Sequence, residues 1–148
     1  MARVELNWNP YDQSDPGPII DVILMNSRDV IEAGQSSGIE YPEPRKLRAL
    51  LDTGASVTVI SKKFANHCKL FQTSEGSEIT GLGATQHCGE HAGSISFPGT
   101  NLRPFDSIRI VSADFVRERN YACLIGRDIL KYWLISFDGR SKRVSIED

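Results

Sequence analysis

The chain has 148 residues, with 17 lysines and arginines against 19 aspartates and glutamates, which gives a formal net charge of −2. This length suits one domain that buries about 70% of its unfolded surface. The near balance of charge lacks the basic surface that nucleic acid or an anionic membrane requires, so neither partner is expected. No apolar run approaches the length of about 18 residues that a membrane-spanning helix needs.

Cysteine usage indicates the redox environment. Cys68, Cys88 and Cys123 are odd in number and widely spaced. This pattern favours free thiols in a reducing compartment such as the cytoplasm over a disulfide framework. The first residues also lack an apolar segment of signal-peptide length. We therefore expect a soluble protein of a reducing compartment, or the soluble part of a longer protein.

The amino-terminal third is predicted to contain an arm, a strand and an insertion. Residues 1–17 are predicted to be an extended arm, because proline, glycine and turn-forming residues dominate 9–18. Residues 19–25 are mostly β-branched or long apolar residues, which indicates a buried strand. Residues 26–44 are rich in glycine, serine and proline, so we expect an insertion that forms a long hairpin connection with a mobile tip. The folded domain is then predicted to span 18–148.

The middle of the chain is predicted to consist of short strands. Strands at 47–51 and 57–60 enclose an Asp-Thr-Gly-Ala-Ser turn. Ser61 is expected to cap a short helical turn over residues 62–65 with its hydroxyl. Further strands are predicted around residue 79 and at 94–97, 108–111 and 122–125. The spacing of turn residues between these segments favours an all-β domain.

The carboxyl-terminal region is predicted to hold one short helix and a closing hairpin. Residues 128–133 place their apolar side chains on one helical face. Residues 134–137 and 143–147 follow as two strands with Gly139 in the turn between them. The predicted fold class is therefore all-β with one short helix near the C-terminus.

Three motifs carry chemical meaning. Asp52 directly follows the apolar residues Ala-Leu-Leu, so its charge must lie near solvent or be held by partners. The second motif, residues 124–130, reads Leu-Ile-Gly-Arg-Asp-Ile-Leu, and Gly126 allows this strand to pass close beneath another loop. The third, residues 79–85, is a glycine-spaced hairpin tip with one apolar residue at its apex, a composition typical of a mobile flap.

Together and in this order, the three motifs resemble those of retropepsin-like aspartic proteases, over residues 18 to about 140. The resemblance implies a single-lobe acid protease fold and a C2 homodimer, because the chain holds one Asp-Thr-Gly and the family takes one aspartate from each subunit. It also implies that the two Asp52 carboxylates share a proton and activate a water, which attacks a peptide carbonyl of a polypeptide substrate. Neither a metal nor a cofactor is expected.

The resemblance assigns a role to each residue of the motifs. Thr53 is expected to hydrogen-bond across the dimer axis, and Gly54 to let the substrate backbone approach. Leu82 at the flap apex is expected to close over an extended peptide and exclude water. Val57 and Ile125 are the candidates for apolar pockets. The full expected set is Asp52 as catalytic residue, Thr53, Gly54 and Ala55 as loop support, Gly81, Leu82, Gly83, Ser56, Val57 and Ile125 in the flap and substrate site, and Gly126 and Arg127 as structural neighbours.

Several residues depart from the family's pattern. Ala55 stands where most cellular relatives have a serine, whose hydroxyl would favour the ionised dyad, so we expect activity nearer mild than strong acidity. Ser56 replaces the aspartate that pairs with the helix arginine in lentiviral enzymes. Arg127 thus loses its expected partner. We expect Arg127 to be a structural residue, buried near the helix start, with its guanidinium satisfied by carbonyls or a carboxylate. The insertion at 26–44 and the longer tail leave the strand order of a dimer sheet open.

Two alternative readings remain. His67, Cys68, His87, Cys88 and His91 supply enough donors for a tetrahedral zinc, although no Cys-x-x-Cys spacing supports such a domain. The other alternative is a protein with the same fold and no catalytic activity: a dimerisation or peptide-binding module whose flap never closes productively. The intact Asp-Thr-Gly favours the enzyme.

Overall fold

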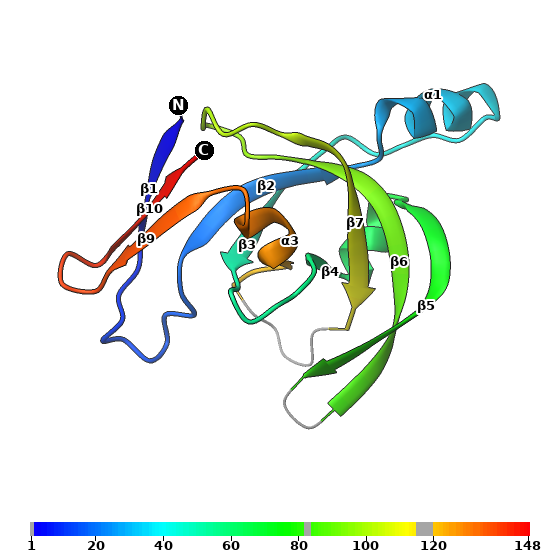
Figure 1. The fold of residues 1–148 in the computed structure, drawn as a ribbon. Helices are drawn as coiled ribbons and strands as arrows, with labels where there is room; N and C mark the ends of the chain where they lie inside the picture. The colour runs from blue at the N-terminus through cyan, green and yellow to red at the C-terminus, as the bar shows by residue number, and fades with distance from the viewer. Residues whose placement is uncertain (1, 82–83, 115–119) are drawn as a thin grey trace.

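The structure, a computed structural model, describes residues 2–81, 84–114 and 120–148 (Figure 1). Over these residues the strands form two sheets. The small sheet has the order β1 (Arg3–Asn7), β10 (Arg143–Glu147), β9 (Leu134–Asp138). The large sheet has the order β2 (Ile19–Met25), β3 (Lys46–Leu51), β8 (Cys123–Ile125), β4 (Val59–Ser61), β7 (Phe105–Ala113), β6 (Ala84–Ser96), β5 (Phe71–Gly81).

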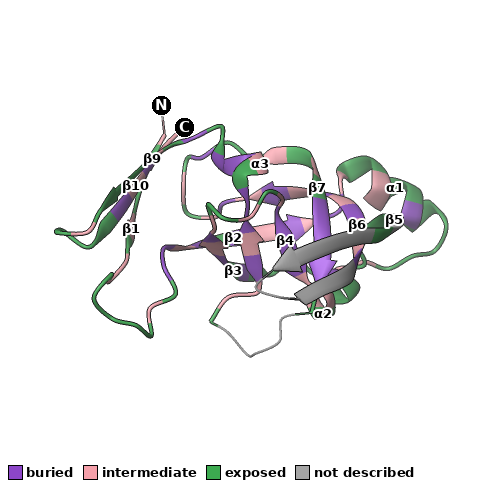
Figure 2. Ribbon diagram, turned by 60° about the horizontal axis from the view of Figure 1, so that its bottom comes forward, coloured by how far each residue is buried: buried purple, intermediate pink, exposed green. Residues whose placement is uncertain are grey.

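The large sheet closes on itself around the main core. Strand β2 pairs with β3 through its first five residues and with β6 through its last three, where Leu24 faces Ile95. The predicted strand at 19–25 is confirmed, and its alternating Ile20, Val22 and Leu24 are buried because successive side chains of a strand point to opposite faces. Buried residues accordingly concentrate inside this closed sheet (Figure 2). Strand β5 lies outside the ring, paired with β6.

The order of the central strands positions the candidate site. Strand β8 lies between β3 and β4, parallel to β3 and antiparallel to β4. The loop that leads from β3 to β4 must therefore cross the end of β8. Because this loop contains the Asp-Thr-Gly turn and β8 ends in the Ile-Gly motif, two segments about seventy residues apart in the sequence lie against each other.

The insertion contains a helix that the sequence analysis did not predict. Helix α1 (Arg28–Ser36) connects β2 to β3 and projects from the barrel in Figure 1. Ser27 caps it by accepting from the Val30 amide at 3.4 Å. Gly34 was one of the residues that suggested a loop in this segment, but it is buried in the helix. The ring of Tyr41 occupies the space that a side chain at Gly34 would need, since a Cβ there would lie 1.9 Å from the Tyr41 hydroxyl oxygen. The expectation that residues 26–44 form a long hairpin connection is therefore wrong where the chain is helical, over residues 28–36.

The other two helices lie where the sequence predicted helical turns. Helix α2 (Lys62–His67) begins after Ser61, but the Ser61 side chain makes no capping hydrogen bond, contrary to the prediction. Helix α3 (Arg127–Leu130) confirms the short helix near the C-terminus and ends earlier than expected. None of the helices in the described part of the chain is long and apolar enough to cross a membrane.

The small sheet joins the two ends of the chain. Part of the expected arm is strand β1, which pairs antiparallel with β10. The predicted closing hairpin is confirmed by the pairing of β9 with β10. Its turn, however, takes its left-handed residue from Lys142, at φ 57°, and not from Gly139. Asp138 stabilises the turn by accepting from the amides of Arg140 and Ser141 at 3.0 and 3.2 Å.

Candidate active site

Asp52 stands at the first position after β3, at the edge of the barrel. Its amide donates to the carbonyl of Ile125 at 2.9 Å, so the backbone is held against the end of β8. Its side chain is half-buried, and its Oδ1 accepts from the Gly54 amide at 2.9 Å. A tight turn closes behind it, since the Ala55 amide donates to the Asp52 carbonyl at 3.2 Å. The carboxylate is thus both positioned by backbone bonds and reachable from solvent.

Gly126 lies directly beneath this loop, as the sequence predicted. A Cβ on Gly126 would lie 2.6 Å from the carbonyl carbon and oxygen of Val57 and 2.9 Å from its nitrogen. Real Cβ atoms do not make such contacts, so this position requires glycine. The crossing is closed further by the Arg127 amide, which donates to the Ala55 carbonyl at 2.9 Å.

Hydrogen bonds between Thr58 and Asp128 hold the other end of the loop. The Asp128 carboxylate accepts from the Thr58 hydroxyl at 2.8 Å and from the Thr58 amide at 3.0 Å. The same carboxylate accepts from the Ile129 amide at 3.0 Å. The Thr58 hydroxyl in turn accepts from the Gly126 amide at 3.3 Å. Thr58 is completely buried, so these bonds satisfy polar groups that water cannot reach.

The sequence analysis missed the role of Thr58. The available signal was a hydroxyl in the middle of the Val-Thr-Val-Ile strand segment, at a position that a buried strand would otherwise give to an apolar residue. The sequence analysis did not place Asp128 in the site. The Asp128 carboxylate is the hydrogen-bond partner that satisfies the buried Thr58 hydroxyl.

Arg127 differs in part from the expectation. The residue is exposed and not buried, because it begins helix α3 on the outer side. Its guanidinium nevertheless binds a carbonyl as predicted: Nη1 donates to the Thr53 oxygen at 2.7 Å. In the absence of a carboxylate at Ser56, this bond ties the helix directly to the backbone of the Asp-Thr-Gly turn.

The remaining loop residues differ in exposure. Thr53, Gly54 and Ser56 are exposed, and Ala55 and Val57 are half-buried. Ile125 is completely buried and belongs to the main core cluster. The side chain of Ile125 therefore packs in the core of the barrel.

Strands β5 and β6 form the long hairpin expected of a flap. Their pairing extends to Gly81 opposite Ala84. The predicted apex residues Leu82 and Gly83 lie outside the described residues. At the base of the hairpin, the His91 ring contacts the Ser112 hydroxyl at 2.9 Å through Nε2 and the Leu70 carbonyl at 3.3 Å through Nδ1. Burial lowers the pKa of His91, and the Leu70 carbonyl opposes this shift.

These contacts bear on the zinc alternative. Both ring nitrogens of His91 are engaged with protein groups. Burial raises the pKa of the thiols of Cys68 and Cys88, and raises that of Cys123 to about 12. Among the residues that the structure describes, no three histidine, cysteine or acidic side chains gather as a metal site would require.

Comparisons with known proteins agree with this geometry. A family model described as "gag-polyprotein putative aspartyl protease" matches residues 43–132, which include the Asp52 loop, the hairpin and helix α3. A search of curated proteins gave no match.

Solved structures with a similar fold include two proteases. The EIAV protease complexed with the inhibitor HBY-793 is 22% identical, with 86% of this chain and 93% of that chain covered and a TM-score of 0.57. A retropepsin-like aspartic protease from Rickettsia conorii is 14% identical, with 97% and 89% covered and a TM-score of 0.53. At these identities the likeness shows the fold. The family match and the fold together establish that the chain belongs to the gag-polyprotein aspartyl protease family and has a retropepsin-like fold.

Proposed function

We propose that the protein is an aspartic endopeptidase that acts as a symmetric homodimer on extended polypeptide segments. The observation that carries the proposal is the placement of Asp52: half-buried at the end of β3, oriented by the Gly54 amide, and backed by a crossing strand that tolerates no side chain at Gly126. An aspartate bonded to the amide two residues further on also occurs in ordinary turns, so the proposal draws on this placement together with the family match over residues 43–132.

The chemistry follows from two such carboxylates meeting at a twofold axis. At a separation of about 3 Å they cannot both ionise, as is established for aspartic proteases as a class, so they share one proton. The ionised Asp52 acts as base toward a water between the subunits, and its protonated counterpart acts as acid toward the carbonyl of the scissile amide. This scheme forms no covalent intermediate with the enzyme and uses no metal.

The neighbouring residues have supporting roles in the proposal. The exposed Thr53 hydrogen-bonds to the loop of the second subunit and fixes the two carboxylates in register. Gly54 leaves space for the substrate backbone. The hairpin tip with Gly81, Leu82 and Gly83 closes over the substrate, which lies extended and is held by main-chain hydrogen bonds. Ser56 and Val57 lie on the loop that would contact its side chains.

The proposal is tested by cleavage of an unfolded protein and a peptide library between pH 4 and 7. Wild type is compared with Asp52→Asn, which keeps the shape of the side chain and removes the charge. Asp29→Asn, an exposed change in α1, is the matched control. We expect loss of at least about 1,000-fold in activity for Asp52→Asn alone, and inhibition of wild type by a statine-type compound. We also expect mildly acidic pH to be optimal, because Ala55 supplies no hydroxyl to the dyad.

The enzyme concentration supplies a second readout. A dissociable dimer loses specific activity on dilution, whereas a monomeric enzyme does not. Equal cleavage by wild type and Asp52→Asn would exclude the aspartic mechanism. A folded wild type that cleaves nothing at any concentration would favour the dimerisation or peptide-binding module instead.

A further inference from the structure

We propose that Arg127 is a positioning residue for the Asp52 carboxylate and acts on it through the peptide unit that joins Thr53 to Gly54. The inference rests on the proposed function, because it concerns the carboxylate that would activate the water. It goes further by naming the contact that keeps a hydrogen-bond donor aimed at that carboxylate.

One peptide unit makes both of the contacts that matter. Its carbonyl, from Thr53, accepts from Nη1 of Arg127 at 2.7 Å. Its amide, from Gly54, donates to Oδ1 of Asp52 at 2.9 Å. Because the C=O and N–H of a trans peptide point in opposite directions, the guanidinium and the carboxylate lie at its two ends. A cation, a peptide dipole and a carboxylate thus form one chain of hydrogen bonds, in which each bond polarises the next.

The turn around this peptide unit permits two orientations of it. The Ala55 amide donates to the Asp52 carbonyl at 3.2 Å, which makes Thr53 and Gly54 the central residues of a β-turn. The two common forms of such a turn differ by a flip of the central peptide, and a glycine in the third position accepts either form. The φ of Gly54 is not positive, so the structure has the first form. A flip would turn the Gly54 amide away from the carboxylate.

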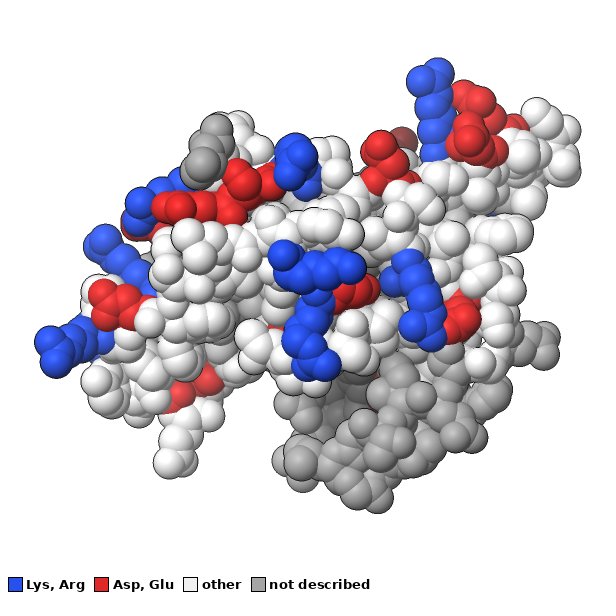
Figure 3. Space-filling model, in the orientation of Figure 1, with Lys and Arg blue, Asp and Glu red and all other residues white. Residues whose placement is uncertain are grey.

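Arg127 is the contact that selects the observed orientation. In the described part of the chain, its side chain is the only donor to the Thr53 carbonyl. Its amide donates to the Ala55 carbonyl at 2.9 Å, so one residue holds the carbonyls on both sides of Gly54. Thr53, Gly54 and Arg127 are exposed, so burial does not fix the peptide instead. Figure 3 shows basic side chains over helix α3, near the centre of the face.

The sequence of the loop makes this contact more important. Ala55 offers no hydroxyl to the dyad, and Ser56 offers no carboxylate to the guanidinium of Arg127. The Gly54 amide is therefore the donor on which Asp52 depends in the described residues. A donor aimed at a carboxylate favours its ionised form over its protonated form. We therefore expect the acid side of the pH–rate profile to depend on Arg127.

The first test observes the Gly54 amide by NMR and needs no cleavage. In wild type labelled with ¹⁵N-glycine, the Gly54 amide proton should shift as the pH passes through the titration of Asp52. Asp52→Asn identifies this step, because the step is absent there. Arg127→Gln removes the charged donor and keeps the backbone bond to Ala55, and we expect it to lose at least about half of the shift, since the peptide is no longer held in one orientation. Arg127→Lys keeps a cationic donor and should give an intermediate shift.

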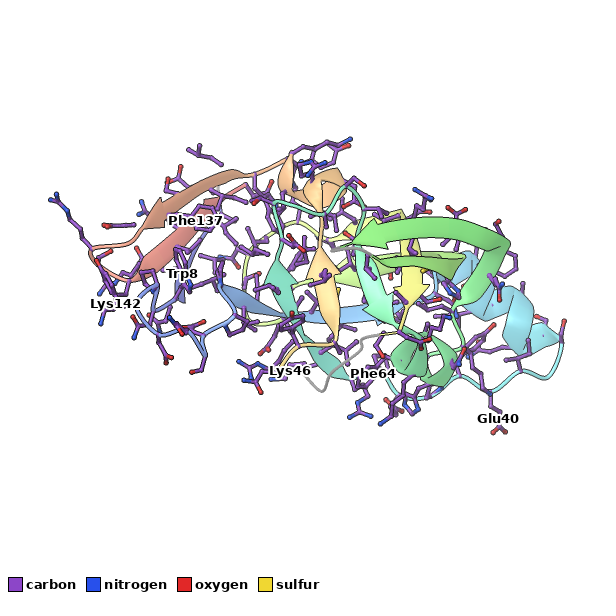
Figure 4. All side chains as sticks on the ribbon, turned by 90° about the horizontal axis from the view of Figure 1, so that it is seen from below. Trp8, Glu40, Lys46, Phe64, Phe137 and Lys142 are labelled. Atoms are coloured by element: carbon purple, nitrogen blue, oxygen red, sulfur yellow. The ribbon has the colours of Figure 1, made fainter. Side chains whose placement is uncertain are left out.

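Two lysines supply matched controls. Lys131 ends helix α3, with its Nζ 5.0 Å from the centre of the Tyr132 ring. Lys46 begins β3, the strand that leads to Asp52, and lies on the side of the barrel away from α3 in Figure 4. Lys131→Gln and Lys46→Gln each remove a positive charge, and neither side chain bonds to the Asp52 loop in the described residues. Both should keep the wild-type shift. A loss like that of Arg127→Gln would indicate a general effect of charge and would overturn the inference.

The second test measures cleavage by Arg127→Gln at enzyme concentrations that saturate the dimer. We expect kcat to fall about 10- to 100-fold while KM stays within about twofold, because the misplaced group acts on the chemical step. The acid side of the pH–rate profile should move up by about 0.5–1 pH unit, because the ionised carboxylate has lost its donor. A residue that only stabilised the dimer would cause a loss that disappears at high enzyme concentration and would leave the profile in place. That result would overturn the inference.

The outcomes separate this inference from the proposed function. A Gly54 amide that behaves as expected in a protein without Asp52-dependent cleavage would overturn the proteolysis and leave the Arg127 contact standing. Asp52-dependent cleavage with an unchanged Gly54 shift and pH profile in Arg127→Gln would overturn this inference alone. Urea unfolding checks the fold of each variant. Should Arg127→Gln fail to fold, Arg127→Lys carries the test, and a shift equal to that of wild type would then overturn the inference.

Discussion

At the scale of single residues, the Asp52 loop depends on a few side chains whose size or polarity is dictated by the crossing beneath it. Gly126 has no room for a methyl group, and Thr58 and Asp128 satisfy each other where water is excluded. These requirements are local and can be tested by single substitutions that change one atom group at a time.

Gly126→Ala should destabilise the protein strongly. The new Cβ would lie 2.6 Å from the backbone of Val57, which cannot rotate away as a side chain would. We expect a loss of about 2–3 kcal/mol in the free energy of unfolding, measured in urea. Gly139→Ala is the matched control, because a Cβ there meets nothing closer than a Pro10 carbon at 3.8 Å. A difference between the two variants below about 0.5 kcal/mol would contradict the close crossing.

Thr58→Val should lower stability while keeping the shape of the side chain. The substitution leaves Asp128 without a hydroxyl donor and the Gly126 amide without its acceptor. The expected cost is about 1–3 kcal/mol in urea unfolding, because buried polar groups lose their partners. Thr58→Ser keeps the hydroxyl and should recover most of the loss. If both variants cost the same, packing of the methyl group and not the hydrogen bonds would explain the effect.

At the scale of elements, the base of the β5–β6 hairpin contains a buried titratable group. His91 on β6 bridges β7 through Ser112 and the start of β5 through Leu70. Its neutral ring accepts or donates at both nitrogens without a charge to bury. The hairpin is therefore packed most favourably when His91 is neutral.

This arrangement predicts a pH dependence of stability. Burial lowers the pKa of His91 in the folded protein below its ordinary value of 6.5, so the unfolded chain binds this proton more readily. Its contribution to stability is therefore complete above about pH 6.5 and is lost as the pH falls toward the lower pKa. Urea unfolding between pH 7 and pH 5 should show a decline that is smaller in His91→Gln. His67→Gln, at an exposed position, is the control and should keep the wild-type slope.

At the scale of the whole molecule, the ion pair of Arg103 with Asp148 joins the barrel to the small sheet. Asp148 follows β10, and Arg103 precedes β7. The Arg103 amide donates to the Asp148 carboxylate at 2.8 Å and its guanidinium at 3.0 Å. The hydrogen bonds from the Arg103 side chain, with a smaller contribution from its amide, lower the pKa of Asp148. The docking of the small sheet against the barrel thus depends in part on this contact.

Asp148→Asn should therefore show a pH-dependent effect. Because the folded pKa lies below the ordinary value of 3.8, the stability that the wild-type carboxylate contributes is complete above about pH 3.8 and is lost as the pH falls through the folded pKa. The difference in unfolding free energy between wild type and variant should thus be present at pH 6 and disappear in strong acid. Arg103→Gln should lose the part of this contribution that comes from the side chain, because its amide remains, and the double variant should lose no more than Asp148→Asn alone. Additive losses would contradict a direct pair.

The sequence by itself determined the all-β class, most of the strands, the short helix near the C-terminus and the place of the Asp-Thr-Gly turn. These features depend on alternating apolar residues and on glycines, which determine the backbone conformation of the few residues next to them in the chain. The family match over residues 43–132 spans the positions of all three motifs, and the similar solved structures share the fold. Gly126 was predictable for the same reason, since the absence of a side chain is visible in the sequence.

Only the tertiary structure decided which distant partners these residues meet. Gly34 of helix α1 packs against the ring of Tyr41. The buried Thr58 hydroxyl donates to Asp128 seventy residues away, and Arg127 donates to the Thr53 carbonyl. The pairing of β1 with β10, which puts β9 at the other side of the small sheet, joins the amino-terminal and carboxyl-terminal strands. Such contacts are made between segments that are remote in sequence, so their energies are settled only when the chain is folded.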